Sequence, residues 1–172
     1  SGQFHCDEVV ACALLKELYP EQKIVRTRDM KIINKYDPVN DDGSANFIID
    51  VGKVYDHSLH KYDHHQSSFN IAFSSKYEND KIVFSPMSSC GLIWLHYGKE
   101  IIEKLVNDQQ VNIDRVFQGL YKYCFHAIDC NDNGIENNYS DSRYIPVELP
   151  SIISTFNGKH TDDEGQLIKF NE

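Results

Sequence analysis

The stretch that decides the fold is Phe47-Ile48-Ile49-Asp50-Val51-Gly52. A continuous apolar run with β-branched residues is typical of a strand that is buried on both faces, as in a parallel sheet. Asp50 closes this run, and Gly52 follows shortly after it. Because α/β proteins gather functional side chains at the carboxyl ends of such strands, we expect Asp50 to be a functional carboxylate.

Helical patterns lie on both sides of this strand. A helix is predicted over residues 7–19, because Val10, Ala13, Leu14 and Leu18 share one side and Pro20 ends the run. Ile24-Val25 is predicted to be a short strand. Two more helices are predicted over 88–107 and 111–128, with these apolar stripes: Leu92, Ile93, Ile101, Leu105 and Val106 in the first, and Ile113, Phe117, Leu120, Cys124 and Ile128 in the second. The alternation predicts an α/β fold with a mostly parallel sheet flanked by helices.

The composition is that of one globular domain. The 172 residues are 41% hydrophobic and 25% charged, and no apolar run reaches the length of about 18 residues that a membrane span needs. The net charge of −9 argues against a protein that coats nucleic acid through surface charge alone. A metal-dependent phosphoesterase remains compatible with this charge, because metal ions supply positive charge locally.

The five cysteines predict free thiols. Their number is odd and no C-x-x-C pair occurs, which argues against a disulfide framework and against a structural zinc site. Free thiols are typical of a reducing, intracellular compartment, and the sequence does not distinguish mitochondrion, nucleus and cytoplasm.

Metal-binding residue types are concentrated in four clusters: His5-Cys6-Asp7-Glu8, Asp50, residues 56–66 with four histidines, and Asp129-Cys130-Asn131-Asp132-Asn133-Gly134. Mixed sets of histidine and carboxylate suit Mn²⁺, Zn²⁺ or Fe²⁺ better than Ca²⁺. Two metal ions about 3.5–4 Å apart need a bridging carboxylate, and Asp50 at a strand end is well placed for that role.

Each cluster also has a purely structural explanation. Acidic residues favour the first turn of a helix, which accounts for Asp7, and aspartates before Gly134 are ordinary turn residues. Asp50 alone fits a turn cap, and the histidines of 56–66 fit a solvated loop. We prefer a metal site because all four clusters occur in one chain in compatible contexts.

Several motifs resemble a known family. Asp63-His64-His65 resembles the signature of the DHH phosphoesterase superfamily. The strings at 1–8, 25–29, 50–52, 62–66 and 132–134 are similar to its melanocyte-proliferating-gene exonuclease branch, also catalogued as metal-dependent protein hydrolases. The resemblance runs from residue 1 to at least 134. It implies that residues 1–172 are a DHH-type N-terminal catalytic domain truncated at both ends, with one further ligand before Ser1 and without the C-terminal substrate domain.

The resemblance also implies a role for individual residues. It makes these residues ligands of two divalent ions, with Mn²⁺ expected and Mg²⁺, Zn²⁺ or Fe²⁺ as alternatives: His5, Asp7, Asp50, His64 and Asp129, with Asp132 as the alternative to Asp129. Asp50 would bridge the two ions. His65 would face the substrate as a phosphate contact or leaving-group acid, and Asp63 would orient a histidine.

The activity that follows from the resemblance is phosphodiester hydrolysis by a two-metal-activated water, in a 3′–5′ exonuclease acting on RNA. Arg26 and Arg28 are candidates for phosphate contacts, although solvated surface arginines are the ordinary alternative. Ser88-Ser89 either binds an anion through backbone N–H groups or caps a helix. The competing functions are a small-phosphate hydrolase, such as a pyrophosphatase or cyclic-dinucleotide esterase, and a non-catalytic metal-binding module. No membrane association is expected, and the oligomeric state is not predicted.

Overall fold

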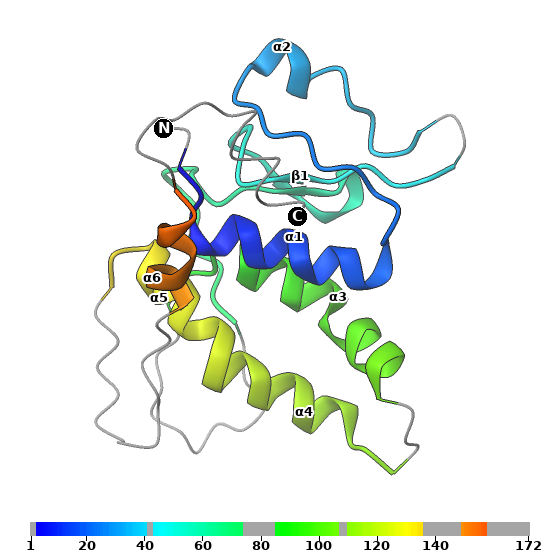
Figure 1. Ribbon diagram of the computed structural model, residues 1–172, viewed down its shortest axis with the longest axis vertical. Coiled ribbons are helices and arrows are strands. Elements are labelled where there is room, and N and C mark those ends of the chain that lie inside the picture. Colours follow the sequence, from blue (N-terminus) through cyan, green and yellow to red (C-terminus); the bar gives the residue numbers. More distant parts are fainter. Residues whose placement is uncertain (1–2, 41–42, 74–84, 107–109, 136–148, 158–172) are drawn as a thin grey trace.

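The computed structural model describes residues 3–40, 43–73, 85–106, 110–135 and 149–157, which form a mixed α/β fold (Figure 1). The helices are α1 (Cys6–Leu18), α2 (Met30–Ile33), α3 (Ser89–Leu105), α4 (Ile113–Leu120), α5 (His126–Asp132) and α6 (Leu149–Thr155). The strands are β1 (Ile48–Ile49), β2 (Tyr55–Asp56) and β3 (Lys61–Tyr62). Two short segments complete the fold, the 3₁₀ helix η1 (His57–Leu59) and the π-helix η2 (Tyr121–Phe125).

The sheet is small and mixed, whereas a mostly parallel sheet was expected. β3 lies in the middle, parallel to β1 and antiparallel to β2. The connection from β2 to β3 consists of η1 and His60 alone. Because parallel strands need a connection of a dozen residues or more, this short connection can only join antiparallel strands.

The expected strand at Ile24-Val25 is not formed. An apolar groove of about 200 Å³ separates this segment from β1, and Phe4, Leu15 and Ile49 are among the residues that line it. β1 is an edge strand, so its side away from β3 pairs with no other strand in the described part of the chain. A strand needs a hydrogen-bonded neighbour, and Ile24-Val25 has none across this groove.

Helix α1 packs against α3 and also contacts β1, while α3 contacts β3 (Figure 1). It buries Asp7, Ala11 and Leu15, which follow one another at intervals of one turn. The predicted stripe was therefore wrong in part, because Ala13 is exposed. An acidic residue belongs to the buried face, so the hydrophobic pattern alone could not locate that face.

Helix α3 forms the centre of the core. Leu92, Ile93 and Ile101 are buried as predicted, together with Trp94 and Tyr97. Leu105, in contrast, is 62% exposed at the end of the helix. Among the described segments, no helix is long and apolar enough to cross a membrane.

The third predicted helix is interrupted by the π-helical turn η2. The buried positions run from Phe117 to Tyr121 and Ile128, whereas the predicted Leu120 and Cys124 are exposed. A π turn holds more residues than an α turn, so the apolar stripe shifts around the helix at this point. This shift determines which side of α5 faces the rest of the molecule.

Candidate metal centre

Four separate segments bring acidic and imidazole side chains together around His64. The Nε2 atom of His64 lies 3.0 Å from Oδ2 of Asp132, 3.5 Å from Oδ1 of Asp50 and 3.9 Å from Oδ2 of Asp7. These residues come from the end of α5, the end of β1 and the start of α1. The expected proximity of Asp50 and His64 is therefore observed.

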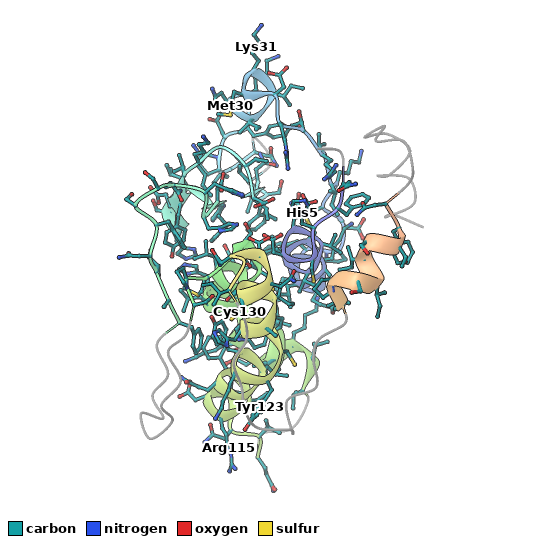
Figure 2. The ribbon with its side chains drawn as sticks, turned by 90° about the vertical axis from the view of Figure 1, so that its left-hand side faces the viewer. His5, Met30, Lys31, Arg115, Tyr123 and Cys130 are labelled. Carbon is teal, nitrogen blue, oxygen red and sulfur yellow. The ribbon has the colours of Figure 1, made fainter. Side chains whose placement is uncertain are left out.

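The donor atoms form two groups. One consists of Asp50, His64 and His65, the other of His5, Asp7 and Asp132, and within each group the ligand atoms lie within 4.8 Å of one another. Figure 2 shows His5 at the N-terminal end of α1, in the middle of the molecule between the α2 end marked by Lys31 and the α4 end marked by Arg115. His5 and His65 are exposed and the other ligands are more buried, so solvent reaches the centre from the side of these two histidines.

Asp50 owes its position to an unusual backbone conformation. Its φ of 58° is left-handed, and it follows β1 directly. Its N–H donates to the carbonyl oxygen of Tyr62 at 3.0 Å, which fixes the turn. Aspartate is one of the few residues that tolerate this region, although the conformation still costs about 1–3 kcal/mol. The strain is compatible with a carboxylate placed for function rather than for the turn itself.

Buried atoms without partners show what the centre can bind. Both carboxylate oxygens of Asp7, Oδ1 of Asp50 and Nε2 of His64 are buried and have no hydrogen-bond partner in the described part of the chain. Unpaired buried charges are costly, because they lose hydration and gain nothing in return. Divalent cations bound by the two groups of ligands would satisfy these atoms, so the residues present fit metal ions.

The charges in the centre are strongly unbalanced. Burial and the neighbouring Asp50 and Asp132 raise the pKa of Asp7 well above its ordinary value. Burial lowers the pKa of His64, but its contacts with Asp132 and Asp50 outweigh this effect and raise the pKa to about 10. The carboxylates thus favour a positive charge at His64 Nε2. Since metal ligation needs the neutral imidazole, a proton and a cation would compete for this atom.

Asp63 and His65 form a pair beside the centre. Oδ1 of Asp63 accepts hydrogen bonds from the backbone N–H of His65 at 2.9 Å and from its Nδ1 at 2.7 Å. Oδ2 accepts from the backbone N–H of Lys53 at 2.6 Å. Although burial raises the pKa of Asp63, these hydrogen bonds lower it further than burial raises it. The His65 side chain is 53% exposed, so solvent reaches this pair.

Asp129 makes its side-chain hydrogen bonds with Ser88 and Tyr121 and belongs to neither of the two groups of ligand atoms. Its Oδ1 accepts hydrogen bonds from the N–H of Ser88 at 3.0 Å and from the Ser88 hydroxyl at 2.7 Å, and its Oδ2 accepts from the Tyr121 hydroxyl at 2.7 Å. A Cβ atom on Gly91 would lie 2.4 Å from Oδ2, so only glycine allows this approach. Burial raises the pKa of Asp129 to about 7 against the effect of these bonds. The geometry therefore favours Asp132, the alternative, as the ligand from α5.

Ser88 occupies the N-cap position of α3, but its side chain makes no capping hydrogen bond to the helix. The N–H of Ser88 at the start of α3 does bind an anion, and this anion is the carboxylate of Asp129.

The two candidate arginines differ in their surroundings. Nη2 of Arg26 lies 3.0 Å from Oε1 of Glu8, and the guanidinium lies 4.7 Å from the centre of the Phe4 ring. Arg26 thus ties its own segment to the start of α1. Arg28 is exposed and lines the apolar groove.

The remaining histidines of residues 56–66 pack elsewhere. His57 stacks on His96 with 3.7 Å between ring centres, and its Nδ1 lies 2.7 Å from the Tyr62 hydroxyl. His60 stacks on Phe47. His96 was not singled out from the sequence, because a lone histidine within a helix carries no signal of its stacking partner.

The fold and the site together define an α/β domain with a mixed carboxylate and imidazole centre that is suited to metal ions. The chain belongs to the MYG1_exonuc family, described as "Uncharacterised protein family (UPF0160)", whose model matches residues 1–172. This confirms the family that the sequence motifs resemble.

Relatives occur in distant eukaryotes. The chain is 38% identical to the MYG1 protein of Caenorhabditis elegans, 34% to that of Saccharomyces cerevisiae and 33% to the human MYG1 exonuclease. Each match covers 95% of this chain and 46%, 47% and 44% of the respective relative. The chain thus spans about half the length of the curated relatives it matches. No solved structure matches it significantly.

Proposed function

We propose that this chain is the metal-binding catalytic domain, of DHH type, of a phosphodiester hydrolase that acts as a 3′–5′ exonuclease on RNA. The observation that carries the proposal is the convergence of Asp7 and Asp50 on His64, with buried atoms that have no hydrogen-bond partner in the described part of the chain. The names of the human and mouse relatives, MYG1 exonuclease, support a nuclease.

The ligand groups are suited to two divalent ions, and we expect Mn²⁺. His5, Asp7 and Asp132 would hold one ion, and His64 would hold the other, with Asp50 between them. Bound ions would supply Lewis-acid activation of a water molecule and would balance the charge of the phosphate. Such local positive charge explains how a chain with a net charge of −9 can act on a polyanion.

His65 is the candidate for proton transfer. Asp63 accepts the Nδ1–H of the ring and so fixes the orientation of the imidazole. As the leaving-group acid, His65 would donate a proton from Nε2 to the leaving oxygen of the phosphodiester. Arg28, which is exposed, is the candidate for a phosphate contact, whereas Arg26 would act through its hold on the start of α1.

The test is an activity assay of the chain with Mn²⁺ on four substrates: RNA labelled at either end, DNA of the same sequence, pyrophosphate and a cyclic dinucleotide. Asp50→Asn serves as the inactive variant and Asp56→Asn as the matched control, because the Asp56 carboxylate accepts its hydrogen bonds from Ser58, outside the centre. Stepwise release of mononucleotides from the 3′ end of RNA supports the proposal. Turnover of pyrophosphate or the cyclic dinucleotide alone would replace it by a small-phosphate hydrolase, and metal binding without any turnover would leave a binding module.

A further inference from the structure

We propose that Ser88 and Ser89 are positioning residues that hold the two sides of the metal centre at a fixed separation. This inference rests on the proposed function, because it assigns the two hydroxyl groups a task in metal binding. Both side chains are fully buried at the start of α3. Ser88 is the N-cap of α3, yet its side chain makes no capping hydrogen bond to the helix. Its hydroxyl therefore serves something other than ordinary capping.

Ser88 connects α3 to the side of the centre that carries Asp132. Its N–H and its hydroxyl both donate to Asp129, which lies on α5 about one turn before Asp132. Two more contacts join α5 to the residues just before Ser88. Nε2 of His126 accepts from the N–H of Ser85 at 3.0 Å, and Nδ2 of Asn133 donates to the carbonyl of Pro86 at 2.8 Å. Helix α5 is thus bound to residues 85–88 at three points, from its first residue to the residue that follows it.

Ser89 connects α3 to the side that carries Asp50 and His64. Its hydroxyl donates to the carbonyl oxygen of Tyr62 at 2.9 Å. The same carbonyl accepts the N–H of Asp50 at 3.0 Å, so Ser89 and Asp50 share one acceptor. His64 follows Tyr62 by two residues. The Ser89 side chain therefore contacts the carbonyl group that binds Asp50 and that precedes His64 by two residues.

Together the two serines form a continuous connection from Asp132 to Asp50 and His64. Metal ligands must be held within about 0.5 Å of the positions in which they bind the ion. Residues that hydrogen-bond to the ligands or to their backbone keep them in these positions. Removing such a group typically weakens metal affinity by about 10–100-fold. If the serines merely stabilised α3, their removal would lower stability and leave the metal affinity of the folded protein unchanged.

The experiment measures Mn²⁺ affinity by calorimetry and the number of bound ions by electron paramagnetic resonance, for Ser89→Ala and Ser88→Ala. We expect about a 10-fold or greater loss of affinity for Ser89→Ala. We expect a smaller loss for Ser88→Ala, because the N–H of residue 88 still donates to Asp129. If Ser89→Ala does not fold, the loss of affinity in Ser88→Ala decides the question.

Two controls separate positioning from stability. Ser154→Ala removes an equivalent hydroxyl bond, from Ser154 to the carbonyl of Ser151 on α6, and should keep wild-type affinity. Ile93→Val lowers the stability of the α3 core without removing a hydroxyl group, and should also keep the wild-type Mn²⁺ affinity. Wild-type Mn²⁺ affinity in both serine variants would overturn the inference but not the metal centre. A loss of affinity in Ile93→Val equal to that in the serine variants would do the same. Failure of the wild-type chain to bind Mn²⁺ would instead reject the proposed function, and this inference with it.

Discussion

The Oδ1 atom of Asp50 lies 3.5 Å from Nε2 of His64, and the N–H of Asp50 is bound to the carbonyl of Tyr62, two residues before His64. Asp50 donates its N–H to this carbonyl from a left-handed conformation, and His64 follows Tyr62 in the chain. The parallel pairing of β1 and β3 places the carboxyl ends of these two strands side by side. The short sheet therefore sets the separation of these two ligands.

Replacing Asp50 by asparagine should abolish metal binding and activity. Asparagine has the same shape and also tolerates a positive φ, so the variant removes the charge and keeps the backbone turn. We expect at least a 100-fold loss of Mn²⁺ affinity, roughly the upper range for groups that merely support ligands. The check is the metal content per chain after dialysis against Mn²⁺, with Asp56→Asn as control. Two bound ions and normal turnover in Asp50→Asn would reject the bridging role.

Asp129 and Asp132 should respond differently to the same substitution. Asp129→Asn disturbs a buried carboxylate that accepts three hydrogen bonds, so we expect the free energy of unfolding to fall by about 1–3 kcal/mol. Asp132→Asn should weaken Mn²⁺ binding strongly and change the stability of the metal-free chain less. Urea unfolding with EDTA present measures the first effect, and calorimetry measures the second. The reverse pattern would restore Asp129 as the ligand.

Local sequence signals located most of the helices and the metal-binding clusters. The buried positions of α3 follow the helical period, and Asp50 comes at the end of an apolar run as expected. Such features depend on neighbours within a few residues, which is the range over which a pattern is visible. The convergence of His5, Asp7, Asp50 and His64 could be expected for the same reason, since each lies at or near the end of an element.

Features that depend on distant partners were not predictable. The choice between Asp129 and Asp132 depends on whether a carboxylate meets the start of α3 or His64, which only the packing of α5 decides. The π turn η2 shifts that packing, and no residue type in Tyr121–Phe125 predicts a π turn. Likewise, Ile24-Val25 has the composition of a strand, but the edge of β1 lies across a groove.

Substitutions of His57 and of His64, which belong to the same histidine-rich segment, should differ sharply in their effect on metal binding. His57 stacks on His96 near the surface, whereas His64 is surrounded by three carboxylates. We expect His64→Ala to lose Mn²⁺ affinity by at least 100-fold and His57→Ala by less than about 3-fold, since a ligand lost from the centre costs more than a supporting group. Calorimetric titration of both variants gives the comparison, and equal losses would show that the wrong histidines were assigned to the metal.

His126 should make the fold sensitive to acid. It is buried, its Nε2 accepts the N–H of Ser85, and burial lowers its pKa to about 4. The pKa of a histidine in the unfolded chain is about 6.5, so between these values the unfolded state binds more protons than the folded state. The stabilising effect of neutral His126 is therefore complete above about pH 6.5 and is lost as the pH falls towards 4, with a slope of up to about 1.4 kcal/mol per pH unit. We expect His126→Gln to flatten this part of the profile of unfolding free energy against pH. Urea unfolding of the metal-free proteins at intervals from pH 7 to pH 4 measures the difference, in which contributions from the carboxylates of the metal centre cancel. Parallel profiles for wild type and His126→Gln would mean that His126 is not held neutral by the fold.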